Sequence, residues 1–449
     1  MKKVLSVLFF TFFLFCCREA KAAHFLQIEE VVSPGGIRAW LVRDDRLPLI
    51  SIRFAFRGGT EQDPPDKQGL AEMTASLLTQ GAGPYDVEAF QKKLANNSIR
   101  MDFSAGRDAI RGGLKTLKST RKEAFSLLRL ALTSPRFDPD SIERIKAQQI
   151  TALQFELGSA SWQARRALFS HIFAGHPYSL RKLGTEETVN NITSSDIRSF
   201  TERILARGNL LVAVTGDIAP AELAIQLDNI FGGLPALPQP AQISEAEWPE
   251  ERAVILVKRD GTQTNFAFAL PMPRRDDPDW FAAEIVNYIL GGGGFSSRLM
   301  LEARDKAGLT YGIQTALAPM DHASILIGQA AVNNPDAGET LDKIKKVLLD
   351  IHENSVTQEE IEAAKDYLTG SLPLALTNTD AIANTLLDIQ LDKLGRDYLE
   401  RRNLLIRQVD TEAVLRVTFR WFDPGKMSFA LVGAPEGINP TIIQEQVKR

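Results

Sequence analysis

Hydrophobic and polar residues alternate in two short stretches of the chain. LISIRFAF (49–56) places its isoleucines and phenylalanines on one face, and NFAFAL (265–270) repeats this alternation. A period of two predicts a half-buried β-strand. Each stretch is followed by a polar turn and then by an apolar run with helical spacing, at 69–81 and at 278–292. The pattern therefore predicts strand, turn and helix twice.

The rest of the chain continues this repeat. In each half, two strand-like stretches precede two amphipathic helices, and an apolar strand ending in glycine closes the half. Corresponding segments lie roughly 215–220 residues apart, as expected for an internal duplication. The pairs are 99–115 and 311–332 for the strands, 121–134 and 339–354, then 141–156 and 357–372, for the helices, and 209–216 and 426–433 for the closing strands.

Helices grouped between antiparallel strands favour the α+β class over strict β–α alternation. The clearest interruption is 234–251, whose four prolines and acidic residues are typical of an extended linker. We therefore expect two similar α+β domains, at 23–233 and 252–449, that face each other across this linker as half of a clamshell. A site is expected at the seam between them.

The N-terminus has the layout of a secretory signal peptide. Met-Lys-Lys precedes an uncharged run at 4–17, and Ala20-Lys21-Ala22 supplies a cleavage site. The run is too short for a comfortable membrane span, although an uncleaved anchor is the alternative. A lipoprotein based on Cys17 fits less well, because the residues before it are not small. The prediction is a signal peptide at 1–22 and an exported, periplasmic protein.

Composition narrows the function classes. The chain has 449 residues, 44% hydrophobic and 24% charged, as in ordinary globular proteins. Both of its cysteines lie within the first 22 residues, so the mature chain is expected to contain no disulfide. Loss of this segment changes the net charge from −4 to −7, because it carries four basic residues and one acidic residue. Nothing here suggests nucleic acid as a partner, or a membrane once the signal is removed.

Several motifs resemble those of the pitrilysin-type (M16, inverzincin) zinc peptidases and the mitochondrial processing peptidase subunits. The clearest is LGGGGFSSRLMLEARDKAGLTYGI (290–313). The others are RGGTEQDPPDKQGLAE (57–72), FAGHPYSLRKLGTEETVNNIT (173–193) and LVAVTGD (211–217). The resemblance covers nearly the whole mature chain and implies a duplicated α+β fold.

Catalytic members carry H-x-x-E-H on the first helix of the first half. Histidines at i and i+4 offer two nitrogens to zinc from one helix face, and the glutamate serves as general base. The corresponding positions here are Glu72, Ala75 and Ser76. Alanine cannot accept a proton, and a serine hydroxyl is a poor zinc ligand. Glu72 by itself is expected to be a solvated carboxylate on the helix surface.

The third zinc ligand of the family, a glutamate from a later helix, is missing as well. Its position falls near Gln148, Gln149 or Ile150, while Glu156 lies about two turns further along. The histidines offer no replacement: His171 and His176 are spaced i, i+5, and His24, His322 and His352 lie far apart in sequence. The chain is therefore expected to bind no zinc.

The second half keeps a pair that the resemblance connects with catalysis. In the family, an arginine and a tyrosine seven residues apart reach over the bound peptide and help to hold the developing oxyanion. Arg304 and Tyr311 have this spacing here, and both side chains are donors suited to stabilising negative charge. Without the family context the same pattern indicates only a charged helix and a strand.

The glycine run has two interpretations. Gly291, Gly292, Gly293 and Gly294 lack the Lys-Ser/Thr sequel of a phosphate loop, so they indicate a helix C-terminus. A similar loop handles substrate in the non-catalytic subunit of the mitochondrial processing peptidase. The resemblance therefore implies a mobile substrate loop as well.

These observations lead to one hypothesis and two alternatives. The chain is predicted to be the zinc-free subunit of a heterodimeric peptidase, with a partner that carries H-x-x-E-H and the zinc, acting on peptides or unfolded segments. One alternative is a degenerate homologue that serves only as a structural or binding scaffold. A self-sufficient peptidase would need a metal site that the sequence does not contain.

Overall fold

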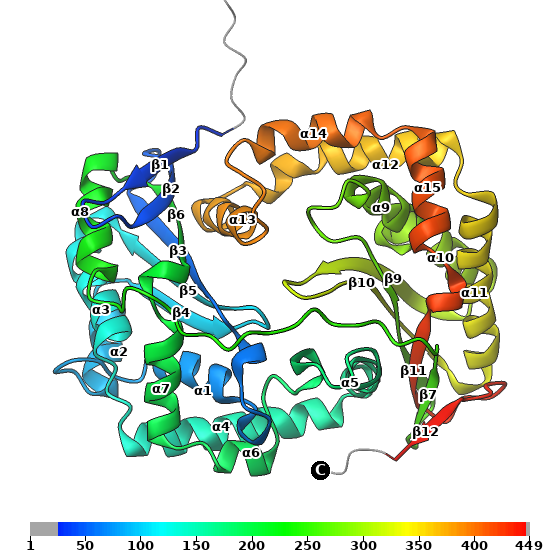
Figure 1. Cartoon of the computed structure of the whole chain (residues 1–449), viewed down its shortest axis with the longest axis horizontal. Coiled ribbons are helices and arrows are strands. Elements are labelled where there is room, and N and C mark those ends of the chain that lie inside the picture. Colours follow the sequence, from blue (N-terminus) through cyan, green and yellow to red (C-terminus); the bar gives the residue numbers. More distant parts are fainter. Residues whose placement is uncertain (1–25, 446–449) are drawn as a thin grey trace, which may run out of the picture.

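The computed structural model describes residues 26–445, and the predicted signal peptide lies outside them. The described residues form two mixed six-stranded sheets, each with helices, in an α+β fold (Figure 1). No helix within this part of the chain has the length and apolar character needed to cross a membrane.

Five strands of each sheet share one topology, whereas the edge strands differ: β1 pairs antiparallel with β2, and β12 pairs parallel with β7. The first has the order β1-β2-β6-β3-β5-β4 and the second the order β12-β7-β11-β8-β10-β9. In each, the closing strand runs parallel to one neighbour and antiparallel to the long central strand. The strands of the first sheet are β1 (Glu29–Val32), β2 (Arg38–Arg43), β3 (Leu49–Arg57), β4 (Arg100–Ala105), β5 (Ala109–Leu117) and β6 (Leu210–Gly216). Those of the second are β7 (Val254–Lys258), β8 (Gln263–Pro271), β9 (Thr310–Pro319), β10 (Ser324–Asn333), β11 (Ser428–Gly433) and β12 (Ile442–Gln444).

Side-chain packing repeats as well as topology. Phe54 on β3 lies opposite Gly112 on β5, and Phe268 on β8 lies opposite Gly328 on β10. A Cβ at either glycine would come within 2.2 Å or 2.1 Å of the phenylalanine ring. Both rings are fully buried, so each glycine is needed to let a ring lie flat across the neighbouring strand. The predicted duplication is thus visible in individual contacts.

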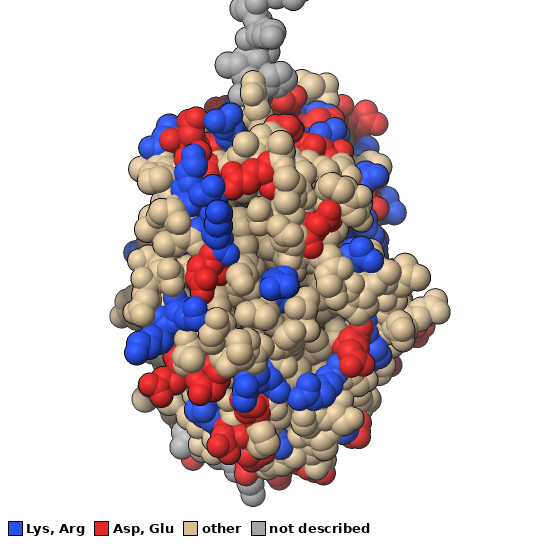
Figure 2. All heavy atoms as spheres, turned by 90° about the vertical axis from the view of Figure 1, so that its left-hand side faces the viewer, with Lys and Arg blue, Asp and Glu red and all other residues tan. Residues whose placement is uncertain are grey.

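The helices of the first half mostly cover the outer face of the first sheet. The isoleucine and phenylalanine side chains of β3 form one core with α1, α3, α4, α7 and α8. Figure 2 shows the outer surface of this half, where basic and acidic side chains are interspersed. The helices are α1 (Leu70–Leu77), α2 (Val87–Asn96), α3 (Arg121–Thr133), α4 (Pro139–Gly158), α5 (Ala160–Ile172), α6 (Glu186–Asn190), α7 (Ser194–Ile204) and α8 (Pro220–Phe231).

The second half repeats this arrangement around its own core. The predicted capping box is present, with Thr357 and Glu360 each accepting from the other's backbone N–H at the start of α12. The helices are α9 (Trp280–Asn287), α10 (Arg298–Met300), α11 (Ala337–Asn354), α12 (Gln358–Gly370), α13 (Thr379–Leu391), α14 (Tyr398–Gln408) and α15 (Thr411–Trp421).

The two halves exchange a helix, which the sequence pattern did not predict. Helix α5 of the first half packs on β8 and β11 of the second sheet, and α13 of the second half packs on β3 and β6 of the first sheet (Figure 1). Each exchanged helix meets a face rich in alanine, which lets it approach the strands closely. These alanines are Ala267, Ala269 and Ala430 beneath α5, and Ala55, Ala109 and Ala213 beneath α13.

The polar face of β3 is therefore not exposed to solvent. The Ser51 hydroxyl bonds to that of Thr379 at 2.9 Å, and Arg53 pairs with Asp380 at 3.4 Å. The predicted linker at 234–251 contains no helix or strand and runs between the two sheets. Its Ala246 N–H bonds to the His322 carbonyl at 2.9 Å, so the linker is tied to the second half before β7 begins.

The exchange predicts that loss of a side chain from α5 destabilises both halves together. Leu168 is fully buried against the second sheet, so Leu168→Ala should lower the free energy of unfolding by about 2–5 kcal/mol. Urea denaturation followed by circular dichroism measures this. The control is Leu404→Ala, which alters a helical leucine that is 57% exposed. An equal, small effect of both variants would contradict the packing role of α5.

Candidate functional site

Helix α1 is held at its N-terminus by side chains from outside the helix. The Asp63 carboxylate accepts from the backbone N–H groups of Gly69 and Ala71, both at 2.9 Å. The Gln149 amide, from α4, donates to the carbonyl oxygens of Gly69 and Leu183 at 3.1 and 2.9 Å. Gln149 therefore lies beside α1, where the sequence placed the distal position, but its amide fastens the helix to a loop.

The three degenerate positions on α1 have ordinary structural surroundings. Ala75 is buried in the core of the first half. The Glu72 side chain is 21% exposed and pairs with Lys182 at 3.2 Å. It also lies 3.4 Å from the backbone N–H of Ala105 on β4. The expectation of a solvated Glu72 was therefore wrong, because β4 and the loop that follows α5 cover this side of the helix.

The side chains of Glu72, Ser76 and Gln149 do not provide the ligands of a zinc site. Glu72 is the one carboxylate among the predicted positions, and its charge is already paired with Lys182. Ser76 and Gln149 offer a hydroxyl and an amide, which are weak zinc ligands. Between residues 26 and 445, no group of three or more His, Cys, Asp or Glu side chains is placed to hold a metal ion.

Two histidines that are distant in sequence meet at the seam. The ring centroids of His176 and His322 lie 6.2 Å apart, one from each half. The sequence spacing did not reveal this proximity. The His176 ring bonds to the Tyr178 backbone N–H and to the Ser244 carbonyl of the linker. Its contacts fasten the linker to the first half, which is a structural role.

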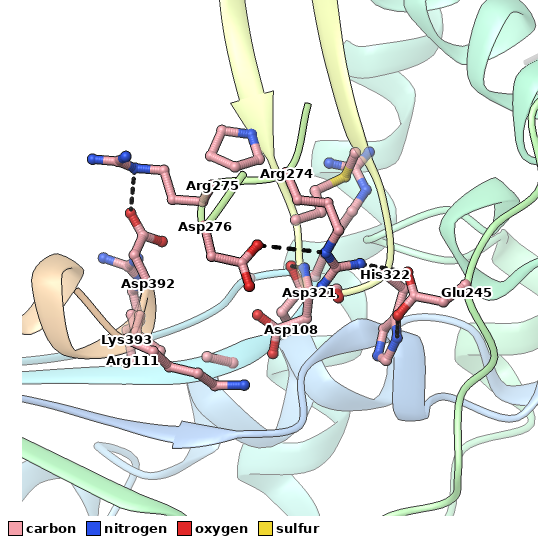
Figure 3. Close-up of a pocket in the computed structure, with 16 residues that line it drawn as sticks. Asp108, Arg111, Glu245, Arg274, Arg275, Asp276, Asp321, His322, Asp392 and Lys393 are labelled. Carbon is pink, nitrogen blue, oxygen red and sulfur yellow. Dashed lines mark hydrogen bonds and ion pairs between the residues drawn. The ribbon is translucent and has the colours of Figure 1, made fainter. Parts of the chain in front are cut away.

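A cavity of about 520 Å³ lies at the seam, lined by charged residues of both signs (Figure 3). Most of these charges neutralise one another. Arg274 pairs with Glu245 at 2.5 Å, and Arg275 pairs with Asp392 at 3.4 Å. Asp321 pairs across the seam with Arg57 at 2.8 Å. The seam cavity therefore joins the halves by balanced ion pairs and offers no group that is poised for chemistry.

Two acidic groups at this side of the seam are removed from solvent: Asp108, which lines the cavity and is partly buried, and Glu61, which is buried. Tyr178 donates its hydroxyl to Asp108, which also accepts from the Asp321 backbone N–H at 3.2 Å. Glu61 is 6% exposed, and its Oε2 has no hydrogen-bond partner. Burial, together with the nearby Asp108 charge, raises the pKa of Glu61 to about 8. Burial also raises the pKa of Asp108.

Arg304 and Tyr311 lie on the surface of the second half, remote from α1. Tyr311, near the start of β9, is 93% exposed and has no hydrogen-bond partner among the described residues. The Arg304 guanidinium lies 4.7 Å from the centre of the Phe295 ring and pairs with Asp305 at 3.0 Å. Phe295 is itself 70% exposed. This group is not explained by packing within the chain.

The glycine run begins within one π-helical turn and ends at a 3-10 turn (Gly294–Ser296), which the short helix α10 separates from a second π-helical turn. The first, η6 (Tyr288–Gly292), extends α9, and the second, η8 (Leu301–Lys306), carries Arg304. Such turns are rare and often occur at functional sites. Gly294 has φ +60, as expected for a residue that ends a helix. Gly291 is needed for space, since a Cβ there would lie 2.6 Å from the Thr315 hydroxyl oxygen.

Comparisons with known proteins agree with the fold described above. The family model described as "Peptidase M16 inactive domain" matches residues 191–368. A solved structure of a peptidase M16 inactive domain from Pseudomonas fluorescens is 26% identical, with a TM-score of 0.85 over 92% of this chain and 100% of that one. The chain therefore resembles M16 peptidase-family proteins in both sequence and fold.

Two curated relatives show the range of this family. The non-peptidase homolog YmxG of Helicobacter pylori is 27% identical over 76% of this chain and 78% of its own length. A probable mitochondrial-processing peptidase subunit beta of Schizosaccharomyces pombe is 23% identical over 86% of this chain and 87% of its own length. The chain therefore resembles both a protein named as a non-peptidase homolog and a probable peptidase subunit.

Sequence reasoning missed a group of basic residues near α1. Arg165 and Arg166 on α5, Arg181 and Lys182 on the loop that follows, and Arg107 between β4 and β5 line one pocket. The doublets at 165–166 and 181–182 were visible in the sequence. Their convergence was not, because it depends on the exchange of α5.

The buried carboxyl of Glu61 predicts a specific pH dependence. Its pKa is raised in the folded state, so between about pH 4.5 and 8 the folded protein holds a proton that the unfolded chain releases. Stability should therefore fall as the pH rises through this range, by up to ~1.4 kcal/mol per unit from this group. Glu61→Gln should reduce this slope in urea unfolding measured at pH 5, 6.5 and 8, leaving the part that comes from Asp63, whose pKa burial raises to about 7. The exposed Glu247→Gln should not, and a parallel slope in both variants would contradict the assignment.

Proposed function

We propose that this chain is the non-catalytic subunit of an exported, heterodimeric metallopeptidase. The observation that carries the proposal is the contrast between its two halves. The helix α1 positions hold Glu72, Ala75 and Ser76 in a closed, ion-paired setting. Tyr311 and Arg304 instead project from the second half next to a glycine turn and two π-helical turns.

The partner would supply what this chain lacks. An M16 subunit with H-x-x-E-H would provide the metal, the attacking water and the general base. The second half of this chain would then close over the peptide, with Tyr311 and Arg304 as donors to the carbonyl oxygen as it gains charge. Pairing is supported by the relative that is named as a subunit of mitochondrial-processing peptidase.

A periplasmic location is part of this proposal. It is supported by residues 1–22, whose charged start, apolar run and Ala20-Lys21-Ala22 site are typical of a signal peptide. The substrates would be peptides or unfolded segments that fit between two half-clamshells. A scaffold role is the alternative, and the H. pylori relative named as a non-peptidase homolog favours it. The two roles differ in whether Tyr311 affects turnover.

The heterodimer model predicts a loss of turnover when Tyr311 loses its hydroxyl. With an H-x-x-E-H partner present, Tyr311→Phe should lower kcat about 10- to 1000-fold, the scale of one oxyanion donor. The fold should be unaffected, since Tyr311 makes no hydrogen bond in the described chain. Peptide cleavage by the reconstituted pair, followed by fluorescence, measures this.

Tyr367→Phe is the matched control, because Tyr367 is also exposed, at 57%, and lies on α12. Its turnover should equal that of the unaltered pair. An active pair in which Tyr311→Phe has no effect would establish the scaffold role instead. Metal-dependent cleavage by this chain without a partner would contradict the subunit model altogether.

A further inference from the structure

A second pocket lies where the exchanged helix α5 meets the second sheet. Its volume is about 490 Å³, close to that of the seam cavity. Helices α4 and α5 and the loop at 177–182 form one side, and Ala318 and Ile327 of β9 and β10 form the other. We call it the arginine pocket, after Arg107, Arg165, Arg166 and Arg181.

The charges in the arginine pocket are not balanced. Its lining contains four arginines and Lys182 but a single carboxylate, that of Glu156. Lys182 is paired with Glu72. In the part of the chain that the structure describes, none of the four guanidinium groups has a carboxylate within 4.0 Å or a hydrogen-bond acceptor. In the seam cavity, by contrast, most of the charges form ion pairs, although Arg107 lines both cavities.

This arrangement is costly without a ligand. The Arg166 Nη1 is buried and has no hydrogen-bond partner. Burial lowers the pKa of Arg166 to about 10, and repulsion from Arg181 and Arg107 adds to the effect. Burial likewise lowers the pKa of Arg107 and of Arg181. A buried guanidinium nitrogen is normally paired, because an unmade hydrogen bond to a charge is expensive. This cost falls on Arg166, since Arg107 and Arg165 are solvent-exposed.

The scaffold holds these cations in fixed positions. Trp162, Arg165, Arg166 and Phe169 follow one face of α5, with the i, i+3, i+4, i+7 spacing of a helix. The neighbouring face of α5 is buried against the second sheet, so the helix cannot rotate away. The Arg107 guanidinium carbon lies 4.5 Å from the centre of the Phe169 ring, and this cation–π contact helps to fix the guanidinium in position.

We propose that the arginine pocket binds a carboxylate of a peptide. Guanidinium groups recognise carboxylates through paired, parallel N–H···O bonds, and four of them converge here without an acceptor. Phe169, Leu180 and Ile327 line the same space and would contact the apolar atoms of the residue that carries the carboxylate. The carboxylate could belong to an Asp or Glu side chain or to the C-terminus of the peptide.

Two observations favour a peptide carboxylate over a phosphate or a nucleic acid. Glu156 lies among the arginines and would repel a dianion more than a monoanion. Lys182 lines the pocket and pairs with Glu72 on α1, so the pocket adjoins the helix whose counterpart in catalytic M16 proteins faces the substrate. In that respect the inference rests on the proposed function and adds a preference for acidic segments.

Direct binding to the full mature chain tests this, without any partner. Three labelled peptides serve as probes: a blocked peptide with glutamates, its glutamine counterpart, and the glutamine peptide with a free C-terminus. We expect at least one carboxylate peptide to bind about tenfold more tightly than the blocked glutamine peptide at low salt. The first two distinguish a side-chain carboxylate, and the third a terminal one.

Variants locate the binding. Arg165→Gln and Arg181→Gln should each reduce the preference for the carboxylate peptide about 3- to 10-fold. Arg144→Gln is the matched control, since Arg144 lies on α4, the helix that carries Glu156, but bonds to Gln80 and does not line the pocket. Thermal unfolding checks that the variants fold. Arg165 is exposed, so Arg165→Gln is expected to fold and to test the pocket directly.

Three outcomes would overturn the inference. They are equal binding of all three peptides, equal loss on Arg144→Gln, and binding of inorganic phosphate or an oligonucleotide but of no peptide. Turnover by the heterodimer is a separate measurement. A pair that cleaves nothing would refute the proposed function while leaving carboxylate binding by this chain intact, and an active pair with no peptide preference would do the reverse.

Discussion

The close packing of two exchanged helices on alanine-rich sheet faces is the constraint on which the rest of this structure depends. Helix α5 lies on Ala267, Ala269 and Ala430, and α13 lies on Ala55 and Ala213. Interiors pack at near-crystalline density, so neither helix can leave its sheet without opening a cavity. Each sheet is thereby covered on its inner face by the other half of the chain. The two halves are related by duplication, but their packing makes them interdependent.

The same exchange decides how charge is distributed between the halves. Where the linker and the β9–β10 turn meet the first half, opposite charges face one another, as in the pairs of Arg274 with Glu245 and Arg57 with Asp321. Where α5 emerges from beneath the second sheet, its polar face brings arginines together without carboxylates. Balanced pairs hold a seam closed, whereas an excess of one sign leaves unsatisfied donors for an anion. Two cavities of similar size thus have different chemical characters.

The first helix shows how a family site is lost while its fold remains. Asp63 and Gln149 still hold the N-terminus of α1, and the core still buries Ala75 and its neighbours. At the first of the ligand positions, the Glu72 side chain forms an ion pair with Lys182. Helix α1 is held in this chain by contacts with β4, α4 and α7. The first half still contributes the positively charged side chains that line the arginine pocket.

The sequence alone determined the elements and their repetition. Period-two strands such as 49–56, helical spacing such as 121–134, the capping box at Thr357 and the glycine positions are local patterns, and local patterns are set by short-range sterics and hydrogen bonding. It also showed that α1 lacks the H-x-x-E-H motif, because residue type at a known spacing can be read directly from the chain. Only the tertiary structure decided that α5 and α13 change places, that Glu72 is paired and that His176 meets His322. It alone brought Arg107, Arg166 and Arg181 into one pocket. Contacts between residues far apart in sequence depend on which sheet a helix covers, and the apolar pattern of a helix does not identify that sheet.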